Sequence, residues 1–240
     1  MDRDDPAYRG QSEYTRSFLR VYDAVILGFF LRFVWRCPTS RLVEGYRQHI
    51  RDRHLDVGPG TGYFIERSGL PDGSRVTILD PNQNVLDYAT RRLSRLEVTA
   101  VRADVLQPLP VDGSFNSAAL HGVIHCLPGP LARKAAAVTN VAAVLAPDGV
   151  LIGMSVLGLS GPQTWLSRLV LGTLNRRGTF DNLTDTEEGL KEILAASFEQ
   201  VELETVGSVA IFVATHPRMA GPHPSPSHSL GTPARGPLLF

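Results

Sequence analysis

The chain has 240 residues, and its 24 basic and 24 acidic side chains leave no formal net charge at pH 7. This length fits one α/β domain with short appendages, and a 43% hydrophobic content allows a sizeable core. The balanced charge gives no electrostatic footprint for nucleic acid or for an anionic membrane surface. Two cysteines, Cys37 and Cys126, are too few and too far apart for a disulfide framework or a zinc site, so we expect a cytoplasmic protein without a bound metal.

The N-terminal region is expected to be helical. Apolar residues recur at helical spacing from Tyr14 to Ile50, with a break at Cys37-Pro38. We expect two or three helices here, with Thr39 or Ser40 as the cap of the helix that follows the break. The longest apolar run, Ala24–Leu31, falls far short of the roughly 20 residues that span a bilayer, so no membrane span is expected.

Beyond residue 50 the pattern alternates between strand and helix, which predicts a mostly parallel, doubly wound α/β sheet. Seven short runs have the composition of strands: His54–Val57, Arg75–Leu79, Val98–Arg102, Phe115–Leu120, Gly149–Val156, Val201–Thr205 and Val209–Thr215. Helices are expected between the first five, at Tyr63–Ser68, Asn84–Arg95 and Leu131–Leu145. Only Val206-Gly207-Ser208 separates the last two strands, so we expect them to form an antiparallel hairpin.

Two further segments complete the chain. Leu157–Asp185 is too long for a simple connection and has a helical apolar pattern around Trp165–Leu174, which is typical of a lid. The helix Thr186–Ala196 follows, and Thr184-Asp185-Thr186-Glu187 fits a capping box that opens it. From Pro217 to Gly236 the chain contains almost no large apolar residue, and we expect a disordered tail.

A glycine-rich turn follows the first expected strand, in the segment HLDVGPGTGYF. Gly58 and Gly60 allow a ligand to approach the main chain, and Gly62 allows tight packing where the next helix begins. A dinucleotide site of the Gly-x-Gly-x-x-Gly type would need a glycine where this chain has Tyr63. A methionine moiety needs backbone groups for its carboxylate and an acidic side chain for its ammonium, and Asp56 can supply the latter.

Acidic residues also follow the second and third expected strands. Asp80 lies about 20 residues beyond the glycines, where a carboxylate can accept hydrogen bonds from both ribose hydroxyls. Asp104 follows the third strand and can accept a hydrogen bond from the exocyclic amine of adenine. Because such sheets bind ligands at the carboxyl ends of their strands, the glycine turn and these two residues predict one adenosine-type site.

These motifs together resemble the class I S-adenosylmethionine-dependent methyltransferases, especially the small-molecule group that includes ubiquinone and menaquinone biosynthesis enzymes. The resemblance covers roughly His54 to Val156. HLDVGPGTGYF is similar to the family's first motif, TILDPNQNVLDYA to its acidic-loop motif, and RADVLQPLPVDGSFNSAALHGVIHCLP to its adenine-binding loop with the fourth strand. LAPDGVLIGMSV is similar to the family's fifth strand.

The resemblance implies a Rossmann-like seven-stranded fold and S-adenosylmethionine as the methyl donor, with S-adenosylhomocysteine as the product. It implies cofactor contacts by Asp56, Gly58, Gly60, Gly62, Asp80, Pro81, Ala103, Asp104, Val105, His121 and Gly122. The family often has an aspartate where this chain has Asn116, which weakens the match without touching the cofactor contacts.

The acceptor side is expected to be apolar. If the acceptor is a hydroxyl, a phenol or an acidic carbon, a general base speeds the reaction by about 10²–10⁴-fold, and His125 and His121 are the candidates. Candidate contacts to the acceptor come from the N-terminal helices and from the inserted segment: Tyr22, Asp23, Phe29 and Trp165. We therefore expect methyl transfer to a hydrophobic or aromatic small metabolite of natural-product or secondary metabolism.

Three alternatives stay open at this point: an S-adenosylmethionine-binding enzyme that catalyses cyclisation or decarboxylation, a nicotinamide-dependent reductase, and a binding or dimerisation module. Tyr63 and the terminal hairpin count against the reductase, and the three intact aspartates count against a module without a ligand. The expected organisation is a helical cap (1–50), a methyltransferase domain (51–216, with 157–185 as the lid) and a tail (217–240). A homodimer is compatible with the sequence.

Overall fold

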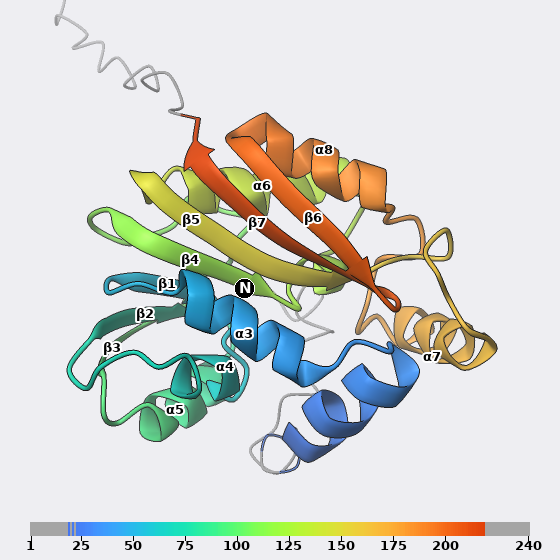
Figure 1. Cartoon of the computed structure of the whole chain (residues 1–240), viewed down its shortest axis with the longest axis horizontal. Helices are drawn as coiled ribbons and strands as arrows, with labels where there is room; N and C mark the ends of the chain where they lie inside the picture. The colour runs from blue at the N-terminus through green and yellow to red at the C-terminus, as the bar shows by residue number, and fades with distance from the viewer. Residues whose placement is uncertain (1–18, 20, 22, 219–240) are drawn as a thin grey trace, which may run out of the picture.

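The computed structural model describes residues 19, 21 and 23–218, and a seven-stranded sheet lies at its centre (Figure 1). The strands are β1 (His54–Val57), β2 (Arg75–Leu79), β3 (Glu97–Val101), β4 (Phe115–His121), β5 (Leu145–Val156), β6 (Phe198–Val206) and β7 (Val209–Pro217). Their order is β3-β2-β1-β4-β5-β7-β6. The first five are parallel, whereas β7 is antiparallel to both β5 and β6. The predicted doubly wound sheet with a C-terminal hairpin is confirmed.

Helices cover both faces of this sheet. They are η1 (Asp23–Val34), α3 (Thr39–His49), α4 (Tyr63–Glu66), α5 (Gln83–Arg92), the short η2 (Ile124–Cys126), α6 (Leu131–Ala142), α7 (Trp165–Arg176) and α8 (Glu187–Ser197). Side chains of α6 and α8 share one core cluster with the sheet, and side chains of α3, α4 and α5 share the other. Helices η1 and α7 lie beyond the sheet in Figure 1, and they pack on each other in a third cluster with the ends of β5 and β7.

Alternation along the central strands divides the core between the two faces. In β4, Ala118 and Leu120 face the α6–α8 side, and Ala119 between them faces the α3–α5 side. In β5, Gly153 has no room for a side chain, because a Cβ there would lie 2.1 Å from Cζ of Phe212 in β7. The Phe212 ring therefore lies directly over β5 and fixes the hairpin against the parallel part of the sheet.

The chain direction places a crevice at the carboxyl ends of β1 and β4. From β1 the sheet grows outward through β2 and β3 on one side, and through β4 and β5 on the other. Connections therefore leave β1 and β4 toward opposite faces, which opens a gap between them where α/β sheets bind their ligands.

The N-terminal helices are joined differently from the expectation. The break at Cys37-Pro38 is confirmed, but the prediction that Thr39 or Ser40 caps the next helix is wrong. Pro38 occupies the cap position of α3 without a side-chain hydrogen bond, and the Thr39 hydroxyl donates instead to the main-chain carbonyl of Leu27 in η1. A residue expected to serve its own helix thus ties two helices together.

The prediction of a capping box that begins at Thr184, before α8, is also wrong. Thr186, not Thr184, is the cap, and its hydroxyl oxygen accepts a hydrogen bond from the Gly189 N–H at 3.0 Å. Asp185, inside the expected box, is buried and pairs with Lys134 instead. A helix within the inserted segment is found at Trp165–Arg176, whereas the expected tail beyond residue 218 lies outside the described residues. Within the described part of the chain, no helix is both long and apolar enough to cross a bilayer.

Candidate active site

The glycine turn after β1 brings the main chain into the crevice. The Gly58 N–H donates to the Leu79 carbonyl at 2.8 Å, which links the turn to the end of β2. Gly58 has a φ of +66°, and a Cβ there would lie 2.7 Å from Cγ2 of Val123. Gly62 has a φ of +76° and forms the cap of α4, where Leu93 packs 3.3 Å from the position of a Cβ. A side chain at Gly58 would collide with Val123 in the wall of the crevice, and one at Gly62 would press on the helix that packs against α4; both backbone conformations favour glycine.

A cavity opens at the ends of β1, β2 and β4. Eight of the residues expected to contact the cofactor line it: Gly58, Gly60, Asp80, Pro81, Asp104, Val105, His121 and Gly122. Asp56 lines a small adjoining cavity together with Gly58, Gly60 and Thr61. Gly62 and Ala103 line neither cavity and lie in the chain next to residues that do. The structure therefore brings together residues that are up to 66 positions apart, from Asp56 to Gly122.

Asp80 suits a ligand with two adjacent hydroxyl groups. Its Oδ1 accepts a hydrogen bond from the Asn82 N–H at 2.7 Å. Burial raises the pKa of Asp80 to about 7, and the Asn82 bond opposes this rise. Hydroxyl donors from a ribose would supply hydrogen bonds that stabilise the charged carboxylate. The neighbouring walls are apolar, with Val85 and Leu127, and accommodate a flat base.

A buried polar cluster holds Asp56 beneath the glycine turn. The Tyr46 hydroxyl donates to Oδ2 of Asp56 at 2.7 Å, and Nε2 of His54 lies 3.5 Å from the same oxygen. His54 is fixed in turn by a 2.9 Å contact between its Nδ1 and the Ser117 hydroxyl. Burial, with a smaller contribution from Asp56, raises the pKa of Tyr46 well above its usual value. Tyr46 therefore remains a hydroxyl donor that orients Asp56, a role that the sequence did not indicate.

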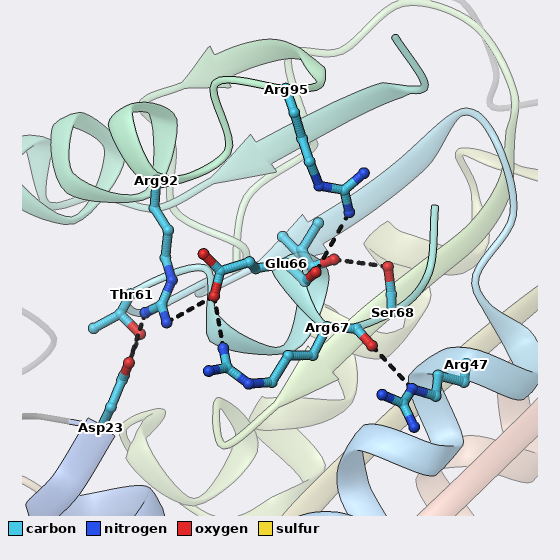
Figure 2. A network of polar contacts seen from close by, with 9 residues as sticks. Asp23, Arg47, Thr61, Glu66, Arg67, Ser68, Arg92 and Arg95 are labelled. Atoms are coloured by element: carbon cyan, nitrogen blue, oxygen red, sulfur yellow. Dashed lines mark hydrogen bonds and ion pairs between the residues drawn. The ribbon is translucent and has the colours of Figure 1, made fainter. Parts of the chain in front are cut away.

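An ion-pair network attaches the N-terminal helix to the glycine turn (Figure 2). Asp23, the first residue of η1, accepts a hydrogen bond from the Thr61 hydroxyl at 2.6 Å and pairs with Arg92 at 2.6 Å. Arg92 also pairs with Glu66 of α4 at 2.9 Å. Asp23 thus positions η1 over the cofactor side of the crevice and lines neither of the two cavities described above. We call Asp23, Thr61, Arg92 and Glu66 the latch.

A second cavity of about 300 Å³ lies between η1, α7 and the ends of β4 and β5. Its walls are mainly apolar and include Phe30, Trp35, Met154, Leu174 and Phe180. It shares His121, Gly122 and Cys126 with the first cavity, so the two adjoin there. We call the first the cofactor cavity and the second the acceptor cavity.

The expected acceptor contacts fall largely outside this cavity. Phe29 is 52% exposed and Trp165 is 78% exposed, and neither lines the wall. Tyr22 lies outside the described residues. The rings that do line the wall include Phe30, whose centroid is 5.8 Å from that of Phe29, and Phe180. The cavity is lined by other aromatic residues of these two regions than the ones expected, because the rotation of each helix decides which ring points inward.

The candidate histidines lie on the acceptor side of the crevice: half-buried His121 lines both cavities, and buried His125 lines the acceptor cavity. Burial, assisted by the nearby His54, lowers the pKa of His121 to about 3. Burial, assisted by Lys134, lowers the pKa of His125 to about 3 as well. Both ring nitrogens of His121 lack a hydrogen-bond partner among the described residues, so a polar group of a bound ligand would satisfy them. Both imidazoles are neutral near pH 7.

A buried ion pair supports the histidine segment from behind. Nζ of Lys134 lies 2.7 Å from Oδ2 of Asp185, and Lys134 also donates to the Asp181 carbonyl. The Asp181 N–H donates to the His125 carbonyl at 3.0 Å, and its Oδ2 accepts from the Gly129 N–H at 2.6 Å. Burial raises the pKa of Asp185, and the contact with Lys134 opposes this rise. Lys134 was not expected to have a role, because its partners lie about 50 residues away.

Comparisons with known proteins agree with this geometry. A family model described as a methyltransferase domain matches residues 55–153, from β1 to β5. Demethylluteothin O-methyltransferase from Streptomyces thioluteus is 34% identical over 87% of this chain and 92% of its own length. The physcion biosynthesis cluster O-methyltransferase from Aspergillus chevalieri is also 34% identical, over 91% of this chain and its full length.

Among solved structures, the N-methyltransferase NodS from Bradyrhizobium japonicum WM9, in complex with S-adenosylhomocysteine, has the same fold. Its TM-score is 0.60 at 18% identity, over 89% of this chain and all of NodS. The Asp80 carboxylate and the Gly58 main chain in the cavity wall, with the unpartnered His121 nitrogens, fit an adenosyl amino acid. With the sequence relatives, these findings show that the chain belongs to the class I S-adenosylmethionine-dependent methyltransferases.

Proposed function

We propose that this enzyme methylates a small aromatic or otherwise hydrophobic metabolite that binds in the acceptor cavity. The observation that carries the proposal is the contact between the two cavities at His121, Gly122 and Cys126. A volume of about 300 Å³ with mainly apolar walls is typical of a small-molecule site. By their names, two relatives act on demethylluteothin and within the physcion biosynthesis cluster, which supports an acceptor from secondary metabolism.

In the proposed mechanism the protein mainly binds and orients. The cofactor supplies, when bound, a methyl group on a sulfonium that is open to in-line displacement. Asp80 and the glycine turn hold the donor, and Phe30 and Phe180 hold the acceptor beside the shared wall. Holding two reactants about 3 Å apart in line can lower the activation free energy by roughly 7–11 kcal/mol. The apolar walls also exclude water, which would otherwise compete for the space beside the methyl group.

Filling the acceptor cavity tests this proposal. Leu174→Trp adds a ring to the wall from α7, and Leu169→Trp adds the same ring on the same helix at a side chain that is 58% exposed. The enzyme would be given S-adenosylmethionine and a panel of hydroxylated naphthalenes, coumarins and anthraquinones, with S-adenosylhomocysteine release as the readout. We expect Leu174→Trp to lose most turnover and Leu169→Trp to keep it.

Binding of S-adenosylhomocysteine, measured by calorimetry, should be the same in both variants and the parent. Equal turnover in the two variants would contradict the placement of the acceptor. Product formation without release of S-adenosylhomocysteine would instead favour a cyclisation or decarboxylation on the same fold.

A further inference from the structure

His125 is held in one protonation form by its surroundings. Its Nδ1 accepts a hydrogen bond from the Val156 N–H at 3.1 Å, so this nitrogen carries no proton. A neutral imidazole carries a single N–H, which must therefore be at Nε2. The ring also packs edge-on against Phe180, with centroids 4.3 Å apart, so it cannot turn freely.

The Nε2 side of this ring is the side available to a ligand in the acceptor cavity. His125 lines that cavity, and its Nδ1 is turned toward the Val156 main chain, so Nε2 lies on the other side of Cε1. Cε1, which is bonded to both ring nitrogens, lies 3.7 Å from the position of a Cβ on Gly122, a residue that both cavities share. None of the described residues forms a hydrogen bond with Nε2. His125 thus presents one N–H donor to the acceptor cavity, and its only lone pair is already used by Val156.

The acceptor cavity has no evident proton acceptor near neutral pH. The titratable side chains among its described lining residues are His121, His125, Cys126 and Arg177, and none of them is a carboxylate. Burial raises the pKa of the Cys126 thiol to about 12, although Lys134 opposes the rise. Both histidines are neutral, and protonating either would place a charge in an apolar wall.

Lys134 of α6 is the charged group that acts on the His125 ring, and it is already paired with Asp185. The neighbouring Asp181 donates its main-chain N–H to the His125 carbonyl, and its carboxylate accepts from the Gly129 N–H. Arg177, which follows α7, lines the acceptor cavity at its exposed end and forms no ion pair with the described residues. A cavity lined by the Nε2–H of His125 and the Arg177 guanidinium, with no carboxylate among its described lining residues, favours an acceptor that brings its own negative charge. Charge-assisted hydrogen bonds are about twice as strong as neutral ones.

We propose that the acceptor binds as an oxygen anion, the enolate or phenolate of an acidic hydroxyl on an aromatic ring system, and that Nε2–H of His125 donates to this oxygen. The inference rests on the proposed function and narrows its substrate class. It also replaces the expectation of His125 as a general base with that of a fixed donor.

Methyl transfer then needs no proton acceptor in the protein. The hydroxyl loses its proton to water before binding. The bound oxygen anion forms its bond to the methyl carbon as the carbon–sulfur bond breaks, and the bonding pair stays on sulfur. One negative and one positive charge cancel, and no proton moves during the transfer. An acceptor whose hydroxyl is largely ionised at neutral pH is therefore favoured over one that is not.

Two probes of similar size test the inference. The enol of 4-hydroxycoumarin is ionised at neutral pH, whereas 1-naphthol is not. The readout is kcat/KM between pH 6 and 9, from S-adenosylhomocysteine release at saturating S-adenosylmethionine. We expect a flat profile for 4-hydroxycoumarin and, for 1-naphthol, a rise of about tenfold per pH unit as its own ionised fraction grows.

Three results of this experiment would overturn the inference. A shared inflection in both profiles would show a base in the enzyme and overturn the inference. Methylation of 1-naphthol alone would also overturn it and leave the proposed function intact. Methylation of neither probe would overturn the inference, and the broader acceptor panel would decide the proposed function separately.

Two variants separate the donor from a structural role. His125→Gln places an amide N–H near the position of Nε2. His125→Asn places an amide oxygen near Nδ1, where it accepts from Val156, but leaves no donor in the cavity. We expect the Gln variant to retain most activity toward 4-hydroxycoumarin and the Asn variant to lose about 10- to 100-fold in kcat/KM, the range of a hydrogen bond to a charged group.

Thermal unfolding and S-adenosylhomocysteine affinity should be similar in the two variants. Equal loss of activity in both, or better activity in the Asn variant, would show that the contact with Val156 is what matters and would overturn the inference.

Discussion

The cofactor cavity and the acceptor cavity share a wall but are built differently. The cofactor cavity lies at the ends of β1, β2 and β4, and its polar groups come from the turns that follow those strands. The acceptor cavity is enclosed by η1, α7 and the segment after α7, which are attached to the sheet rather than part of it. The strand ends are fixed by pairing on both sides, whereas the attached helices depend on a few long-range contacts. The structure thus combines a rigid donor site with an acceptor site that can vary without disturbing the sheet.

The largest effect is expected from breaking the ion pair behind the acceptor side. Lys134→Met leaves the buried carboxylate of Asp185 without its partner, and loss of one member of such a pair costs about 3–5 kcal/mol. Urea unfolding should show this loss in the free energy of unfolding. The double variant Lys134→Met, Asp185→Leu should recover most of it, since no buried charge remains. A double variant no more stable than the single one would contradict this explanation.

A smaller effect, confined to the cofactor side, is expected from Asp80→Ala. It removes the carboxylate that we assign to the ribose hydroxyls, and hydrogen bonds to a charged group contribute about 1.5–3 kcal/mol each. Calorimetry should show S-adenosylhomocysteine affinity reduced by at least about tenfold. Asp87→Ala is the control, since Asp87 is on the following helix and does not line the cofactor cavity. Unchanged affinity in Asp80→Ala would contradict the assignment.

The pH dependence of cofactor affinity gives a further comparison. Burial raises the pKa of Asp80 to about 7, so below pH 7 the carboxyl is mostly protonated. Ribose hydroxyls donate to the ionised form, so binding must then be accompanied by loss of that proton, and affinity falls as the pH falls. We expect S-adenosylhomocysteine to bind about tenfold more weakly at pH 6 than at pH 8. Asp80→Asn should bind more weakly but without this slope, and an equal slope in the variant would assign it to another group.

The same contrast explains what the sequence could predict. Strands β1 and β2 have the expected bounds, because short apolar runs between turn residues are local signals. Asp56 lies within β1 and Asp80 directly follows β2, so their places are fixed by these strands. The acceptor side depends on how helices are rotated. In η1 the Trp35 N–H bonds to the carbonyl of Phe30, five residues earlier, and this wider turn places Phe30 inward and leaves Phe29 exposed. A period of 3.6 residues does not describe such a helix.

Contacts between distant segments gave no local signal either. Thr39 and Asp185 lie at positions where helix capping is common, but the side chain of each binds a partner in another segment instead of capping its helix. Lys134 and Asp185 are 51 positions apart, and no motif in the sequence links the two. The expected cytoplasmic location, the division into cap, domain and lid, and a homodimer stay predictions.

The smallest expected effect concerns the latch, where the two sides of the site are joined. Asp23→Asn keeps an acceptor for the Thr61 hydroxyl but removes the charge that pairs with Arg92. The two side chains are 30% and 17% exposed, so the pair contributes about 1 kcal/mol at most. Because η1 borders the glycine turn as well as the acceptor cavity, a weaker latch should let it move away more often and speed the release of S-adenosylhomocysteine. We expect a two- to fivefold faster dissociation rate in stopped-flow displacement, about the factor that such an energy allows.

Arg75→Ala is the matched control for the latch, since it removes an exposed ion pair with Asp52 at the opposite ends of the strands. S-adenosylhomocysteine should dissociate from this variant at the same rate as from the parent enzyme. If S-adenosylhomocysteine also leaves the Asp23→Asn variant at the parent rate, η1 does not control access to the donor site, and the two cavities open independently. If it dissociates faster, donor release depends on a helix that also encloses the acceptor, and a bound acceptor that packs against η1 should slow that release.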